Sequence, residues 1–159
     1  MMTIISSVVS IDKRIDFLTQ TPWANGMSHS EVQTLSSYMK VLQALKGEVI
    51  LKEGGSESFM CIIVEGKVQV VKENTKNNPK VIATLNEGKS FGEMSIFDGE
   101  PRSAAVIAAS DALLLTLTKG SLDRMLHEKP LIGVKLLFKL GRVLSQRLRL
   151  MDGKVVDYL

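Results

Sequence analysis

The 159-residue chain has few of the residues that build disulfides and metal centres. It contains one cysteine, Cys61, and two histidines, His29 and His127, which lie far apart in the sequence. A single cysteine cannot form an intrachain disulfide, so an oxidising compartment is not implied. A zinc or iron site built from histidine and cysteine is therefore not expected, nor is an iron–sulfur cluster. The composition does not exclude a metal site built from carboxylate oxygens, although no metal or other cofactor is predicted.

Aromatic residues and long apolar runs are also scarce. Aromatic side chains make up 5% of the chain and do not interleave with its late basic residues, which argues against a surface that stacks nucleic-acid bases. No apolar run approaches the roughly 18 residues that span a bilayer. The first residues lack a basic segment before their weak apolar patch, so a signal peptide is not indicated. We expect a cytoplasmic protein.

The charge that is present is slightly basic, with a formal net charge of +3 and a sequence pI of about 9.0. Two interpretations of the late basic residues are open: the solvated face of a helix, and a patch for nucleic acid. A solvated helix face is the commoner origin of such a run, so we favour it. The residues concerned are Lys135, Lys139, Arg142, Arg147, Arg149 and Lys154.

The hydrophobic patterns predict a single domain, 1–159, in three regions. Residues 1–40 have apolar side chains at helical spacing, which predicts two N-terminal helices. Residues 41–118 contain short apolar runs divided by turn signals about every 8 to 12 residues, which is typical of a small antiparallel sandwich or barrel. Helical spacing returns over 119–151, which predicts C-terminal helices.

Several residues mark where these helices begin. Ser28 and Glu31 have the spacing of a capping box for the second helix. Ser121 is predicted to cap the first C-terminal helix, and Pro130 to break that helix or to begin the next one. The wide apolar stripe from Leu136 to Met151 predicts a last helix of about five turns that lies against another surface.

The stretch "SFGEMSIFDGEPRSA", Ser90 to Ala104, interrupts the predicted strands. A solvated loop would explain its charges, but loops that interrupt a sheet are frequently functional. Met94 to Phe97 is predicted to form a short helix whose first amides have no partner within the helix and can therefore bind an anion. Gly92 has no Cβ, so a ligand can approach the backbone closely there.

Three polar side chains of this stretch suit a nucleotide. Arg102 offers a planar, two-pronged donor for phosphate oxygens, and Ser103 adds a hydroxyl. Glu93 is an acceptor when ionised, so it suits a ligand hydroxyl instead of a phosphate. We therefore predict that Glu93 and Arg102 act on different groups of one ligand. The sequence has neither a P-loop nor a Rossmann fingerprint.

"FGEMSIFDGEPRSAAV" resembles the phosphate-binding cassette of the cyclic-nucleotide-binding domain family, which includes the catabolite activator protein, protein kinase A regulatory subunits and cyclic-nucleotide-gated channels. The glycines in "ILKEGG", "CIIVEGKVQVV" and "ATLNEGKSFGE", which are Gly54, Gly66 and Gly88, are similar too. The resemblance extends from about Leu18 to Leu148. It implies an α+β fold, an antiparallel eight-stranded β-roll of jelly-roll type with flanking N-terminal helices, a C-terminal helix pair and a short cassette helix.

The resemblance also implies a role for each residue of the ligand site. Arg102 would pair with the exocyclic phosphate oxygens of a cyclic nucleotide. Glu93, with Gly92 beside it, would hold the ribose 2′-hydroxyl. The backbone amides that share the phosphate charge would be those of Met94, Ser95, Ser103 and Ala104.

Contacts to the base come from the β-roll and the last helix in this family. The implied residues here are Val70, Ala83 and Leu85 of the roll, with Val143 or Arg147 as lids. Leu140 and Leu144 are neighbouring substitutes for the lid, and plain packing of the helix is an equally open interpretation of both positions.

The identity of the nucleotide follows less directly. Cyclic AMP and cyclic GMP differ only in the base, and Ser103 is compatible with either. We favour cyclic AMP because it is the commoner ligand among relatives that resemble bacterial members of the family. Cyclic di-GMP, which some relatives have adopted, is a further possibility.

Members of this family rarely act by chemistry, so an enzyme is not expected. The resemblance implies a sensor that converts ligand occupancy into movement of the C-terminal helix, read by an effector protein or by a homodimer mate. No helix-turn-helix follows the last helix, so direct DNA binding is not expected. Two rival hypotheses are a ligand-free interaction module on the same fold and an enzyme on a cupin-like roll, which would need clustered histidines.

Overall fold

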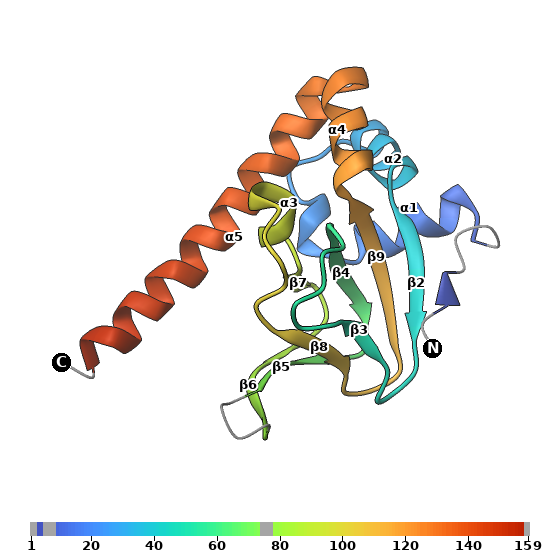
Figure 1. Cartoon of the computed structure of the whole chain (residues 1–159). Coiled ribbons are helices and arrows are strands. Elements are labelled where there is room, and N and C mark those ends of the chain that lie inside the picture. The colour runs from blue at the N-terminus through green and yellow to red at the C-terminus, as the bar shows by residue number, and fades with distance from the viewer. Residues whose placement is uncertain (1–2, 5–8, 74–77, 158–159) are drawn as a thin grey trace. The chain divides into compact units, whose positions relative to one another are not determined.

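The computed structural model describes residues 3–4, 9–73 and 78–157 (Figure 1). The chain divides into two compact units, Met1–Leu122 and Asp123–Leu159. The organisation of 1–159 as one domain stays a prediction. None of the helices in the described ranges has both the length and the hydropathy to cross a membrane.

The first unit begins with the two predicted helices, α1 (Ile11–Thr19) and α2 (His29–Ser37), separated by the short 3-10 helix η1 (Pro22–Ala24). The capping box is confirmed. The Ser28 hydroxyl accepts the Glu31 amide at 3.1 Å, and the Glu31 carboxylate accepts the Ser28 amide at 3.1 Å. Helix α1 contacts both η1 and α2 and also strand β9, so the N-terminal helices are held against the sheet.

Strands of the described residues form two antiparallel sheets, in the orders β1-β2-β9-β4-β7 and β3-β8-β5-β6. Figure 1 shows β4, β9 and β2 running side by side in the first of these. Strands β2 to β9 make up the eight-stranded roll, so the predicted fold class is confirmed, and β1 adds two residues to one edge. The strands are β1 (Thr3–Ile4), β2 (Lys40–Ala44), β3 (Val49–Leu51), β4 (Phe59–Glu65), β5 (Val68–Glu73), β6 (Pro79–Leu85), β7 (Ser90–Phe91), β8 (Ala105–Ala108) and β9 (Ala112–Thr118).

The core of the roll is filled from both sheets. Cys61 and Ile63 of β4 meet Val68 of β5 and Val106 of β8 in one apolar cluster. Along β5, Val68 and Val71 are buried and Val70 is half-buried. The register between β5 and β6 shifts at this point, because Val70 lies opposite Ala83 and Val71 lies opposite Val81. The extra residue, Ile82, therefore belongs to β6.

The cassette occupies the connection between β7 and β8. Its short helix, α3 (Met94–Asp98), is present as predicted and contacts β4. Gly99 ends the helix with φ +68°, a left-handed conformation that favours glycine at a helix C-terminus. Strand β7 pairs with β4, with Phe91 opposite Cys61. This pairing fixes where the cassette leaves the sheet.

Two helices follow the roll, α4 (Lys119–Glu128) and α5 (Pro130–Asp157). The prediction that Ser121 caps α4 is wrong. The Thr118 hydroxyl accepts the Ser121 amide at 3.0 Å, so Thr118 holds the cap position, three residues earlier. Pro130 begins α5 as one of the two alternatives predicted, and α5 is longer than expected because its helical backbone continues to Asp157.

Within the second unit, α4 and α5 approach closely at Gly133. A Cβ added there would lie 2.7 Å from Leu126 Cδ2 and 3.5 Å from Leu126 Cα. A larger residue would therefore push the two helices apart at this point.

Candidate functional site

Arg102 is held inside the cassette by backbone carbonyls. Its Nη1 donates to the carbonyl of Gly92 at 2.7 Å, and its Nη2 donates to the carbonyl of Phe59 at 2.6 Å. The guanidinium carbon also lies 5.2 Å from the centre of the Phe59 ring, within the range of a cation–π contact. The loop that carries Arg102 is thus tied to the exit of β7 and to the start of β4.

The backbone of Arg102 is fixed as firmly as its side chain. Its amide donates to the carbonyl of Gly55 at 2.9 Å, and its carbonyl accepts the amide of Gly54 at 2.8 Å. These two bonds join the end of the cassette to the connection between β3 and β4. The direction of the Arg102 side chain is therefore set from both sides.

Burial makes the Arg102 guanidinium unusual. The side chain is 8% exposed, and burial lowers its pKa, while the nearby Cys61, Glu57 and Glu93 raise that pKa. Its Nε is buried and has no hydrogen-bond partner among the described residues. A buried cation with an unsatisfied donor is costly, so an anion that reached Nε would stabilise this arrangement.

Glu93 and Cys61 share this buried environment. Glu93 is 1% exposed and immediately precedes α3. Burial raises the pKa of the Cys61 thiol, with Arg102 lowering that pKa and Glu93 raising it. Cys61 is therefore close enough to both charged groups to interact with them electrostatically. It is an uncharged thiol at neutral pH.

The residues of α3 divide between inward and outward positions. The Ser95 hydroxyl is buried and donates to the carbonyl of Gly92 at 3.2 Å, the same carbonyl that accepts Arg102. Met94 is 60% exposed. The amide of Ile96 donates to the carbonyl of Glu93 at 3.1 Å. The amides of Met94 and Ser95 precede it, where helix geometry offers no intrahelical partner.

Of the two glycines in the cassette, Gly92 and Gly99, Gly92 is the more closely surrounded. It has φ +81°, and an added Cβ would lie 2.8 Å from the Phe59 carbonyl and 3.1 Å from Arg102 Nη1. Beyond the arginine, Ser103 is exposed and Ala104 is half-buried. The predicted ligand residues of the cassette are therefore gathered around the Gly92 carbonyl and the two ends of one loop.

The three predicted base contacts of the roll are neighbours. Val70 lies opposite Ala83, and Val68 lies opposite Leu85, in the pairing of β5 with β6. Val70 and Leu85 are partly buried and pack against the core cluster that contains Phe91. Ala83 is exposed. The tertiary structure thus brings the three residues to one end of the second sheet.

The predicted lid residues belong to the second unit. Val143 and Arg147 lie on α5, one helical turn apart, and both are half-buried. The substitutes Leu140 and Leu144 lie on the same helix. A contact of any of these four with a ligand stays a prediction.

Sequence reasoning missed Phe59, which supplies both a carbonyl and a ring to Arg102. The carbonyl could not have been found, because every residue has one and the 43-residue separation from Arg102 is closed only by the fold. The aromatic ring at the start of an apolar run was the one available signal. Gly55 was missed for the same reason as the Phe59 carbonyl.

No three histidine, cysteine, aspartate or glutamate side chains gather into a metal-binding group within the part of the chain that the structure describes. The chemistry that the cassette offers is the recognition of an anion and a hydroxyl. Its cation and its acidic side chain come from opposite ends of one loop.

Residues 41–129 match the sequence profile of a family described as "Cyclic nucleotide-binding domain". A cyclic AMP receptor protein of Thermus thermophilus is 28% identical over 132 residues, covering 83% of this chain and 59% of the relative. The human cyclic nucleotide-gated channel beta-3 is 30% identical over 148 residues, covering 91% of this chain and 18% of the channel. The chain thus spans about three fifths or less of the length of these curated relatives.

A solved structure resembles nearly the whole chain. It is a crystal structure of a cyclic nucleotide-binding domain from Methylobacillus flagellatus, with a TM-score of 0.82 and 25% sequence identity. The similarity covers 99% of this chain and 89% of that one.

Proposed function

Since the chain belongs to the cyclic nucleotide-binding domain family, we propose that its cassette binds a cyclic mononucleotide, with cyclic AMP favoured over cyclic GMP. The observation that carries the proposal is Arg102, a buried guanidinium whose two amino groups bind carbonyls while its Nε has no partner among the described residues. A cyclic phosphate has one negative charge and would satisfy this donor.

The phosphate would be shared between Arg102 and backbone amides. The amides of Met94 and Ser95 begin α3, where donors have no intrahelical partner. Those of Ser103 and Ala104 follow Arg102 on the other side of the loop. Recognition by fixed amides needs little reorganisation when the ligand arrives, whereas the buried Nε of Arg102 becomes accessible only when neighbouring atoms move.

The remaining parts of the nucleotide are assigned to residues at the edge of the cassette. Glu93 accepts the ribose 2′-hydroxyl, because an ionised carboxylate is an acceptor only. Val70, Ala83 and Leu85 contact the base, with Val143 or Arg147 closing over it. The name of the Thermus thermophilus relative, cyclic AMP receptor protein, supports the preference for cyclic AMP.

The output of binding is a change in the C-terminal helix, read by an effector protein or a homodimer mate. A ligand shifts a conformational equilibrium only when it binds the two states unequally. The domain acts by binding and not by catalysis, in the cytoplasm. The alternatives are a ligand-free interaction module on this fold and a domain that binds cyclic di-GMP.

Isothermal titration calorimetry of the purified protein tests the proposal. Cyclic AMP, cyclic GMP and cyclic di-GMP are titrated separately, with 5′-AMP as the control that lacks the cyclic phosphate. We expect the tightest binding for cyclic AMP. Absence of binding by both cyclic mononucleotides at about millimolar concentration would leave the interaction module as the better hypothesis, and binding of cyclic di-GMP alone would favour the other alternative.

A further inference from the structure

Two rows of exposed side chains run along α5, and each repeats every seven residues. A seven-residue repeat keeps side chains on one face of a helix, as in coiled coils. In the first row, Leu131 and Phe138 are 79% and 75% exposed. The first row is Leu131, Phe138 and Ser145, and the second is Lys135, Arg142 and Arg149, all six exposed.

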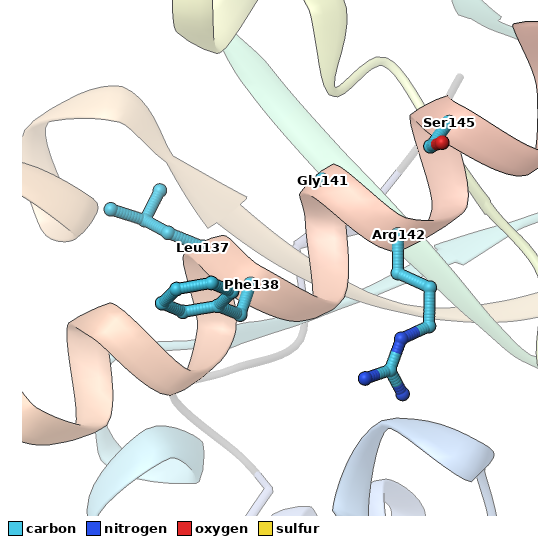
Figure 2. A pocket seen from close by; sticks show the side chains of 5 residues that line it. All are labelled: Leu137, Phe138, Gly141, Arg142 and Ser145. Carbon is cyan, nitrogen blue, oxygen red and sulfur yellow. The ribbon is translucent and has the colours of Figure 1, made fainter.

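Between the rows the helix surface is hollow. Figure 2 shows the residues that line this hollow along α5, which are Leu137, Phe138, Gly141, Arg142 and Ser145. Four of them, Phe138, Gly141, Arg142 and Ser145, have the i, i+3, i+4, i+7 spacing of the hole that receives a side chain in knobs-into-holes packing. A Cβ added at Gly141 would meet nothing within 4 Å, so the glycine leaves the hole open.

The charge of this helix has one sign over most of its length. Residues 130–151 contain five basic residues and no acidic residue. Burial lowers the pKa of Lys139, and the neighbouring charges of Arg142 and Lys135 lower it further. A ligand that brought carboxylates to this face would relieve that repulsion.

We propose that the face formed by these two rows docks an acidic amphipathic helix of a partner protein. An apolar side chain of the partner enters the hole at Gly141 and contacts Phe138. Carboxylates at seven-residue spacing on the partner pair with Lys135, Arg142 and Arg149. The hole at Gly141 requires an apolar side chain on the partner helix. The row of cations, which repeats every seven residues, requires carboxylates at the same spacing.

Other occupants fit these observations less well. A second copy of the chain would place the basic rows against each other in an antiparallel helix pair, and in a parallel pair it would leave them without acidic partners, because 130–151 has no acidic residue. Nucleic acid would use the cations but would bury Leu131 and Phe138 against phosphates. An anionic membrane would use the cations and the apolar row, but it has no use for a hole spaced for one side chain.

The partner helix would belong to the effector protein that reads the proposed sensor. Only this assignment to an effector rests on the proposed function; the docking itself does not. Docking of an acidic helix is measured without nucleotide. Nucleotide binding is measured by calorimetry without the helix. Failure of either result therefore leaves the other unaffected.

The test uses a fluorescent synthetic peptide of about four heptads. In every heptad of the peptide, one core position is leucine and the other core position is glutamate. Its binding to the full chain is followed by fluorescence anisotropy, and a second peptide with lysine in place of glutamate is the control. We expect the glutamate peptide to bind and the lysine peptide not to bind. Raising the salt concentration from about 50 mM to about 500 mM should weaken binding, because salt screens the ion pairs.

Two variants test the hole and the cations separately. Gly141→Leu fills the hole and should abolish peptide binding while leaving thermal stability unchanged or raised, because leucine favours a helix more than glycine does. The triple variant Lys135→Glu, Arg142→Glu and Arg149→Glu should weaken binding by about tenfold or more. Its matched control, Lys13→Glu, Lys46→Glu and Lys72→Glu, changes net charge equally on exposed residues of α1, a turn and β5 and should bind normally.

Three outcomes would overturn the proposal. One is equal binding of the glutamate and lysine peptides. Another is sedimentation of the wild type as a dimer that both α5 variants dissociate, with no peptide bound, which would make a second copy the occupant. The third is that the wild type binds duplex DNA or phosphatidylserine vesicles but not the glutamate peptide, and that the α5 triple variant loses this binding.

Discussion

The side chain of Arg102 donates a 2.7 Å hydrogen bond to the carbonyl of Gly92, at the opposite end of the cassette. The same carbonyl accepts the Ser95 hydroxyl, so one backbone oxygen joins the start of the loop, the short helix and the arginine. Because Arg102 also binds the Phe59 carbonyl, the guanidinium is positioned before any ligand arrives. Preorganisation of this kind lowers the cost of binding.

Arg102→Ala should reduce the affinity for cyclic AMP by about 2 kcal/mol or more, roughly 30-fold, because the phosphate loses its charged donor. Arg102→Lys should lose nearly as much, since lysine is a point charge that cannot reproduce the planar fork. Calorimetry on both variants measures the change. Unchanged affinity in Arg102→Ala would remove Arg102 from the site.

Gly92→Ala should destabilise the protein by about 1 to 3 kcal/mol and weaken nucleotide binding, because the new Cβ meets the Phe59 carbonyl at 2.8 Å and Arg102 Nη1 at 3.1 Å. Gly99→Ala is the matched control. Gly99 also has a positive φ, +68°, but its added Cβ has nothing within 4 Å. Only the backbone strain is common to both, so Gly99→Ala should keep its affinity. Equal losses of affinity in both variants would contradict a steric role for Gly92.

Glu93→Gln should weaken the binding of cyclic AMP but not that of its 2′-deoxy analogue. The amide keeps the size of the side chain but replaces an ionised acceptor of the ribose hydroxyl, a difference of about 1 to 2 kcal/mol. The four affinities form a double-mutant cycle that isolates the contact. If the substitution costs the same with both nucleotides, Glu93 acts through the fold and not through the hydroxyl.

The Cys61 thiol should make the protein less stable in alkaline solution. Burial raises its pKa in the folded chain, whereas the unfolded thiol titrates near its ordinary value of about 8.5. Above that pH the unfolded chain releases a proton that the folded chain keeps, so rising pH favours unfolding. The free energy of unfolding should fall by about 1.4 kcal/mol per pH unit from this source.

Urea unfolding of the wild type and of Cys61→Ala, between about pH 7 and about pH 10, measures this effect. The variant is less stable at neutral pH because it leaves a small cavity in the core. The difference between the two proteins should nevertheless shrink as the pH rises. A constant difference across this range would show that the thiol does not contribute to the pH dependence.

Local patterns in the sequence predicted much of this protein. The Ser28–Glu31 capping box, the short helix from Met94 and the start of α5 at Pro130 are present because each depends on residues within one or two turns. The eight-stranded roll followed from the resemblance of the cassette and its glycines to a known family. Thr118 and Ser121 both have a hydroxyl near the start of α4, and Thr118 caps the helix in place of Ser121.

The sequence by itself determined which chemical groups are available within a single loop, namely the Arg102 guanidinium, the Glu93 carboxylate and Gly92, which has no Cβ. Only the tertiary structure decided what those groups contact. The Phe59 carbonyl reaches Arg102 because the register of β4 with β7 places Phe91 opposite Cys61, and the extra residue Ile82 in β6 shifts the pairing of β6 with β5. Strand register and backbone carbonyls depend on the packing of the whole sheet and leave no mark on the identity of a single residue.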